Sequence, residues 1–485
     1  MKAQRSFFWS MLQFVTVFAI ELGGLLVLSR LLTPTDMGHY AVAFAIAGLG
    51  QFIGSFALNT FIIRSDDMAR STRQKVAGVA FAMGPLMTLA LAVIALLSWN
   101  TALDATVSSL LLVMAAAPLL GQLGTIEGGL LTREMRFRAI FVQRLLTTLS
   151  FQAVAIPLAL WQFGAISLAC GLVVSTLVNS VISTVLTRGA FLVRPTFRGL
   201  HTVTRFSSII LTTNIFGKIG EAVVPVLIGQ LATYAAVGHF SRASELIRHA
   251  QRVVQDGVLP ALMPLVLRAK RDGAALKPLC LQTLAYLTAL CWPIAGTLIV
   301  LAEPLVFILL GDQWEAVPVL LRLLAVGIIV LPVISTGGVF ALALGLERRL
   351  LHIQVGLLIA KIGIALLFIP AGLPVFCAMI AVMAGGHAVV SFWIVLRRLD
   401  VTGPDLAGAV WRSGVASLAF ALPLGMVSAV LTGTIATDFA VLASAGCVAA
   451  LLWLVALVFL NHPIRAELAR ILPMVRTHPS KQAIG

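Results

Sequence analysis

Five charged side chains follow one another at intervals of three or four residues: Arg242, Glu245, Arg248, Arg252 and Asp256. This spacing places them on one face of an α-helix. At 1.5 Å per residue, the charged stripe is about 21 Å long. Guanidinium groups match phosphate oxygens with paired N–H donors. The stripe is therefore suited to an anionic ligand that carries phosphate or pyrophosphate.

The chain around this stripe is too apolar for a soluble protein. Of its 485 residues, 60% are hydrophobic and 11% are charged, and the mean hydropathy is +1.03, whereas a soluble domain has about 25% charged residues. Cutting the sequence at polar or turn-rich breaks leaves segments of membrane-spanning length. We therefore predict an all-α integral membrane protein with about fourteen transmembrane helices. The breaks lie at 30–36, 64–75, 100–104, 132–138, 161–164, 188–204, 230–234, 268–278, 311–315, 345–349, 370–374, 397–404 and 433–438.

The basic residues orient these segments. The chain has 34 Lys and Arg against 19 Asp and Glu, and 27 of the 34 fall in the termini and in or beside alternate breaks, while the other breaks hold only Arg30. Because cytoplasmic loops are enriched in Lys and Arg, both termini are predicted to be cytoplasmic. The excess positive charge is then a topology signal, and nucleic acid is not expected as a partner. No loop is long enough for a soluble catalytic domain, so we predict a protein that is not an enzyme.

The charged stripe itself is predicted to cross the membrane. An amphipathic helix on the cytosolic surface is the alternative that hydropathy favours, but it would invert the side of every later loop, including 268–277. A centrally placed Arg that faces lipid costs about 3 kcal/mol. The three arginines of the stripe are therefore expected to face a water-filled cavity.

An internal repeat has a period of 200 residues. Residues 21–40 align with residues 221–240 without a gap, and the identical pairs include Glu21 with Glu221, Gly38 with Gly238 and His39 with His239. Transporters are often built from two related halves. We predict six-helix lobes at 1–200 and 201–400, related by a pseudo-twofold axis along the membrane normal. Two further helices are predicted at 401–460, and a cytoplasmic tail at 461–485.

Further intramembrane charges are candidates for the same cavity. Lys218 and Glu221 are three residues apart, and Lys361 lies in a later segment. The alternative for the first two is an internal ion pair. Intramembrane carboxylates can titrate or bind a cation, which makes a proton or sodium gradient a candidate energy source, although interhelical hydrogen bonding explains such carboxylates equally well. The candidates for ion coupling are Glu21, Glu221, Glu245 and Asp256.

Other chemistry is not indicated by the sequence. The five cysteines have no metal-ligand or disulfide spacing, and there is no phosphate-binding Gly-rich loop for ATP and no hydrolase or metalloprotease motif. No cofactor, metal or catalytic residue is predicted. His39 and His239, at the starts of the second and eighth predicted helices, are expected to have capping or packing roles.

Four segments resemble a known family. The runs LLTPTDMGHYAVAFAI (31–46), LLTREMRFRAI (130–140), GHFSRASEL (238–246) and LPALMP (259–264) are similar to the polysaccharide-export flippases of the multidrug/oligosaccharidyl-lipid/polysaccharide (MOP) superfamily, in particular Wzx-type transporters of the colanic-acid-type branch. The resemblance implies a MATE-like fold with a cationic cavity lined by helices 1, 2, 7 and 8. Carried over residue by residue, the resemblance implies that the cationic residues of this cavity are Lys218, Arg242, Arg248 and Arg252. The second helix departs from the pattern, because it has no charge between Tyr40 and Arg64.

The same resemblance implies a function. Such a protein moves oligosaccharide repeat units linked to undecaprenyl pyrophosphate across the bacterial inner membrane by alternating access, for O-antigen or exopolysaccharide synthesis. Membrane lipids, a polysaccharide polymerase and a chain-length regulator are the implied partners. The alternatives are a lipid II flippase, a MATE-type multidrug antiporter and, from another class, a membrane-embedded polysaccharide polymerase.

Overall fold

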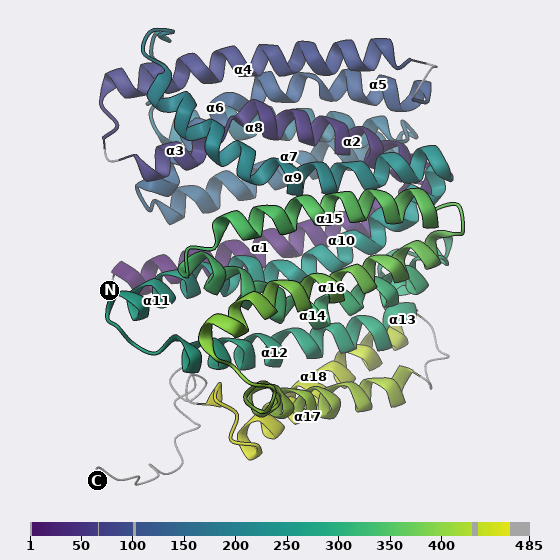
Figure 1. Ribbon diagram of the computed structural model, residues 1–485. Coiled ribbons are helices and arrows are strands. Elements are labelled where there is room, and N and C mark those ends of the chain that lie inside the picture. Colours follow the sequence, from purple (N-terminus) through teal and green to yellow (C-terminus); the bar gives the residue numbers. More distant parts are fainter. Residues whose placement is uncertain (1, 66, 100–102, 429–434, 466–485) are drawn as a thin grey trace. The chain divides into compact units, whose positions relative to one another are not determined.

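The protein is all-α (Figure 1). A computed structural model describes residues 2–65, 67–99, 103–428 and 435–465. Within these ranges there is no β-strand, and the only β-type pairing is an isolated bridge between Trp99 and Leu103. The predicted fold class is therefore confirmed. The predicted tail at 461–485 lies largely outside the described residues, from residue 466 onward.

The described residues form eighteen α-helices and one 3-10 turn. In order they are α1 (Lys2–Leu31), α2 (Pro34–Ser55), α3 (Leu58–Arg64), α4 (Arg70–Leu97), α5 (Ala105–Met114), α6 (Ala116–Arg133), α7 (Phe137–Leu160), α8 (Ile166–Leu186), α9 (His201–Leu231), α10 (Tyr234–Gly257), α11 (Leu259–Arg271), α12 (Leu276–Val300), α13 (Ala302–Leu309), η1 (Asp312–Trp314), α14 (Val317–Ala343), α15 (Glu347–Phe368), α16 (Leu373–Leu399), α17 (Gly403–Ser428) and α18 (Ile435–Phe459).

Helices end and begin in or beside the first twelve predicted breaks, and the last, at 433–438, falls partly outside the described residues. Among the residues described, eleven helical segments are long and apolar enough to span a membrane, and α9, bent by 50° between Thr212 and Asn214, makes a twelfth. Helix α18 has a shorter apolar part at Ser444–Phe459, and α10 carries too much charge to count. The protein is thus a multi-pass membrane protein, and the number fourteen stays a prediction.

Two of the breaks inside predicted helical segments lie near equivalent positions of the repeat. Between α2 and α3, Phe56 and Ala57 adopt left-handed backbone conformations with φ of 45° and 51°. The break frees the carbonyl of Gly54, which accepts a hydrogen bond of 3.1 Å from the buried Gln122 amide. Such side-chain donors satisfy backbone groups that lipid cannot. Helix α10 is separated from α11 at Val258, close to the equivalent position of the repeat.

The repeat is also seen at the helix ends. Helices α1 and α9 end at Leu31 and Leu231, and α2 and α10 begin at Pro34 and Tyr234, so each boundary recurs after 200 residues. The residues before α2 and α10 are threonines whose hydroxyls accept a backbone hydrogen bond from the residue three positions later. The sequence repeat therefore corresponds to a repeated helix–turn–helix junction.

The chain divides into two compact units. The first comprises residues 1–241, 309–314 and 358–373. In it α7 packs on α1 and α8, α6 on α3, α4 and α8, and α2 on α4, α5 and α9. One core of this unit joins α3, α4, α6 and α9 and contains the fully buried Phe191. The predicted lobe boundaries at 200 and 400 stay a prediction.

The second unit comprises residues 242–308, 315–357 and 374–485. In it α12 packs against α14 and α17, α17 against α18, and α11 against α14. The core around Phe340 and Phe392 includes Leu262 and Val266 of α11, which holds this short helix against the unit.

Candidate functional site

Helix α10 carries the charged stripe on one continuous helix. Its 24 residues make it about 36 Å long, which exceeds the roughly 30 Å of a bilayer core. The length is therefore sufficient for the predicted crossing, and the crossing itself stays a prediction. The side chain of Asp256 lies outside the described residues.

The first two charges of the stripe form an ion pair. Arg242 Nη1 lies 2.5 Å from Glu245 Oε2, and the side chains are 9% and 34% exposed. The two residues are one helical turn apart, so the helix itself positions the pair. Because the carboxylate neutralises it and burial covers it, Arg242 has less to offer a ligand than the sequence analysis assumed.

The next two arginines differ from Arg242. Both Arg248 and Arg252 are exposed, and they lie one turn apart on the same face of α10. Arg252 makes polar interactions of its own within the protein. Their guanidinium groups are reachable by an external ligand, and facing lipid would be expensive for both. They are the cationic part of the candidate site.

A second group of charges surrounds the middle of α9, in the first unit. Lys218 Nζ lies 2.7 Å from Glu221 Oε2, so the predicted ion pair is present. From α15, Lys361 Nζ donates a hydrogen bond of 3.3 Å to the carbonyl of Gly220. Two lysine side chains therefore lie beside a single carboxylate. A cavity common to this group and to α10 stays a prediction.

The remaining intramembrane carboxylates have different surroundings. Glu21 is half-buried in α1 and makes polar interactions there, and its role in ion coupling stays a prediction. Glu127 is fully buried in α6, and its Oε1 accepts a hydrogen bond of 2.8 Å from the backbone N–H of Phe191. The Glu127 carboxylate is thus a hydrogen-bond acceptor for the loop that follows α8.

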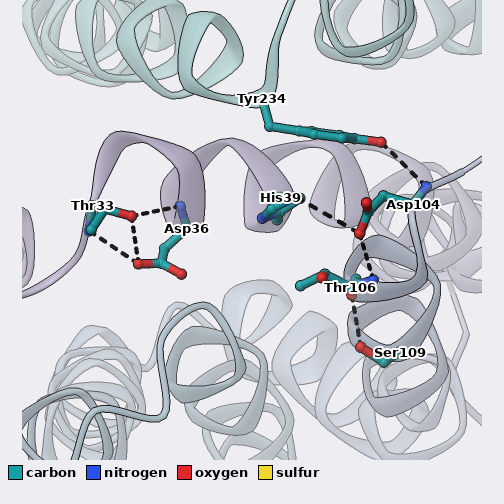
Figure 2. Close-up of polar contacts among 7 residues, drawn as sticks. All are labelled: Thr33, Asp36, His39, Asp104, Thr106, Ser109 and Tyr234. Carbon is teal, nitrogen blue, oxygen red and sulfur yellow. Dashed lines mark hydrogen bonds and ion pairs between the residues drawn. The ribbon is translucent and has the colours of Figure 1, made fainter.

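A polar cluster lies where α2 begins (Figure 2). The His39 ring lies against the Tyr234 ring, with centroids 4.3 Å apart, and His39 Nε2 is 3.9 Å from Asp104 Oδ1. The backbone N–H of Asp104 donates a hydrogen bond of 3.3 Å to the Tyr234 hydroxyl. The N–H of Thr106 donates to the Asp104 carboxylate and lowers the pKa of that carboxyl below its ordinary value. This cluster was not predicted from the sequence, because Asp104 is distant in the chain from both His39 and Tyr234.

The equivalent histidine packs against an indole ring. The His239 ring meets the edge of the Trp314 indole at a centroid distance of 5.7 Å. Trp314 is fully buried, and its Nε1–H donates a hydrogen bond of 2.9 Å to the carbonyl of Ser29 at the end of α1. The Gln313 amide donates to the same carbonyl. Both histidine rings therefore lie against an aromatic ring, and a packing role for them stays a prediction.

Comparison with known proteins identifies the relatives of this chain. The family described as "Polysaccharide biosynthesis protein" matches residues 27–318, which is more than half of the chain. The succinoglycan biosynthesis transport protein ExoT of Rhizobium meliloti (strain 1021) is 27% identical over 318 residues, or 65% of this chain. The match spans 64% of that relative's length.

Solved structures share the fold. The lipid II flippase MurJ in an inward closed conformation matches 95% of this chain and 100% of its own, with a TM-score of 0.74 and 11% identity. An inward-facing multidrug resistance MATE family transporter of the MOP superfamily matches 79% of this chain and 94% of its own, with a TM-score of 0.64 and 14% identity. The family match over residues 27–318 covers more than half of the chain, so the chain belongs to the polysaccharide biosynthesis protein family.

Proposed function

We propose that this protein is a flippase that moves oligosaccharide repeat units, linked to undecaprenyl pyrophosphate, from the cytoplasmic to the periplasmic leaflet of the bacterial inner membrane. The observation that carries the proposal is the pair of exposed arginines, Arg248 and Arg252, one turn apart on a helix long enough to cross the bilayer. The family match and the name of the Rhizobium relative, a transport protein of succinoglycan biosynthesis, support a role in polysaccharide export.

The chemistry of the arginines favours a pyrophosphate over other cargo. A pyrophosphate linkage carries negative charge that must leave water to cross the membrane, and fixed guanidinium groups replace its lost solvation. A drug antiporter that binds organic cations would need the opposite charge along this helix. In our proposal the pyrophosphate is held by Arg248 and Arg252, the glycan is solvated in the cavity, and the lipid tail remains in the bilayer.

Alternating access supplies the transport step, and the energy source is proposed to be an ion gradient. The two lobes rock about the bound cargo, and Glu21, Glu221, Glu245 and Asp256 are the candidate carboxylates for a coupling proton or sodium ion. Both termini are placed in the cytoplasm, as the basic residues indicate. A polysaccharide polymerase and a chain-length regulator are the proposed partners downstream.

The test is complementation of a deletion strain with Arg248→Ala, Arg252→Ala and the double variant. The expected result is loss of surface polysaccharide, together with accumulation of lipid-linked repeat units on the cytoplasmic side. Arg268→Ala is the matched control, because Arg268 is also exposed and pairs with Asp272 on its own surface turn. This control should export normally.

Three outcomes would contradict the proposal. Unchanged export in the double variant would remove the arginines from the mechanism. If the deletion strain instead accumulated lipid II and stopped making peptidoglycan, the lipid II flippase alternative would replace the proposed cargo. Polymer made but shortened, with no trapped repeat units, would indicate the polymerase alternative.

A further inference from the structure

The first turns of α2 and α10 contact each other through their backbones, within the first compact unit. A Cβ atom added at Gly38 would overlap the carbonyl oxygen of Tyr234, and a Cβ atom added at Gly238 would overlap the carbonyl oxygen of Pro34. Backbone cannot move aside as a flexible side chain can. Each contact therefore requires glycine while the two turns remain together.

The two contacts are reciprocal across the repeat. Gly38 and Gly238 are 200 residues apart, and so are Pro34 and Tyr234. In each copy the carbonyl belongs to the first residue of the helix, Pro34 or Tyr234. The glycine that the other copy's carbonyl contacts lies one turn later. This arrangement is what a local twofold axis between two equal helix ends produces.

The Tyr234 side chain makes a further contact beside the two turns. Figure 2 shows the Tyr234 side chain beside His39 and Asp104, joined to Asp104 by one hydrogen bond of 3.3 Å. The Thr33–Asp36 capping bonds stay within α2. These capping bonds hold the first turn of α2 in shape whether or not it touches α10.

We propose that Gly38 and Gly238 form a two-sided gate, whose backbone contact closes one end of the transport path and must open once in each cycle. This inference rests on the proposed function, because it takes alternating access as the mechanism. The basic residues predict that this junction lies on the periplasmic side, so the closed contact corresponds to a state that is open, or able to open, to the cytoplasm.

The gate is tested by distance measurement between spin labels in nanodiscs. Labels are placed on cysteines that replace the exposed residues Thr35 and Ala232. Cys170 and Cys447 are replaced by serine, because the other three native cysteines are buried. The shortest-distance population of the parent is expected to disappear in Gly38→Val and in Gly238→Val, with a shift to longer distances and loss of export.

Gly48→Val is the matched control, because Gly48 is in the same helix as Gly38 and has open space where a Cβ would lie. It should retain the shortest-distance population. The inference is overturned if both gate variants also retain it.

A cross-linking measurement keeps the native glycines and so does not depend on the folding of the valine variants. A short bis-methanethiosulfonate reagent joins the cysteines at positions 35 and 232, and reductant releases them. Export should stop in proportion to the cross-link yield and return after reduction, and either single-cysteine chain should be unaffected. Continued export at a high cross-link yield overturns the gate.

The two proposals fail in different ways. Arg248→Ala with Arg252→Ala, introduced into the spin-labelled chain, should lose export and keep the shortest-distance population. If the protein carries a different substrate, the spin labels still report whether the glycine contact opens. If the glycine contact is not a gate, export by the arginine variants still tests whether Arg248 and Arg252 bind the substrate.

Discussion

Helices α2 and α10 begin alike and then diverge. Both follow a threonine cap, both carry Gly-His one turn into the helix, and both spans break about 22 to 24 residues later. Beyond the first turns, α2 has no charge after Asp36, whereas α10 has five charged residues. The part that the two copies share makes the junction, and the part in which they differ holds the candidate chemistry. The comparison therefore separates the residues that form the junction, which the two helices share, from the charged residues proposed to bind the substrate, which only α10 has.

The largest expected effect comes from breaking the ion pair that only α10 has. Arg242→Ala leaves the Glu245 carboxylate partly buried without its partner, and the free energy of unfolding should fall by about 2–3 kcal/mol. This is less than the roughly 3–5 kcal/mol of a fully buried pair, because Glu245 is 34% exposed. Chemical denaturation in detergent measures the loss. Arg242→Met combined with Glu245→Leu should recover most of it, and a double variant as unstable as Arg242→Ala would show that the pair is not the cause.

A second prediction gives α2 a charge that α10 has. Gly48 is the counterpart of Arg248 in the repeat, and it has open space around it. If both helices line one cavity, Gly48→Arg should restore export in an Arg248→Ala background by about tenfold, equivalent to about 1.4 kcal/mol of binding. Gly48→Glu, at the same site with the opposite charge, should restore nothing. Equal results for Arg and Glu would place Gly48 away from the cargo.

A third prediction concerns Asp104, the carboxylate that faces His39. Asp104 caps α5 by accepting from Thr106, so Asp104→Ala should cost about 1 kcal/mol of stability. Because folding lowers the pKa of this carboxyl, its contribution is present above the ordinary value near 4 and is lost as the pH falls through the lower folded value. Thermal unfolding should show the same difference from the parent at pH 7 and pH 5, and a smaller one at pH 3. A difference that disappears already at pH 5 would contradict this assignment.

The smallest expected effect comes from the cap. In α2, Thr33 and Asp36 form a reciprocal capping box, whereas in α10 the residue matching Asp36 is Ala236. Ala236→Asp supplies the missing half of the box and should stabilise the protein by about 0.5 kcal/mol. Asp36→Ala should have an effect of opposite sign and similar size. Calorimetry of the two variants compares the caps, and a loss of stability in Ala236→Asp would mean that the two junctions are not equivalent.

The sequence was most informative where the physics is local. The polar breaks coincide with helix ends because lipid tolerates charged and turn-forming residues only at the ends of spans, and the spacing of Arg242 and Glu245 predicts contact within one helix. The break at Phe56 and Ala57 was not foreseen, because the two residues with left-handed backbone are not glycine. Asp104 beside Tyr234, and Lys361 beside Gly220, are tertiary contacts between distant segments, and no local pattern encodes them.

The reciprocal glycine contact has a consequence for how such chains can change in length. Within each copy, the residue whose carbonyl touches the other helix and the glycine that is touched in return are four residues apart, which is one helical turn. The contact fixes this spacing of four residues. It does not depend on the number of residues between the two copies. Insertions and deletions between the copies can therefore accumulate freely, and related chains whose copies are not 200 residues apart should still carry glycine at the fifth residue of each helix.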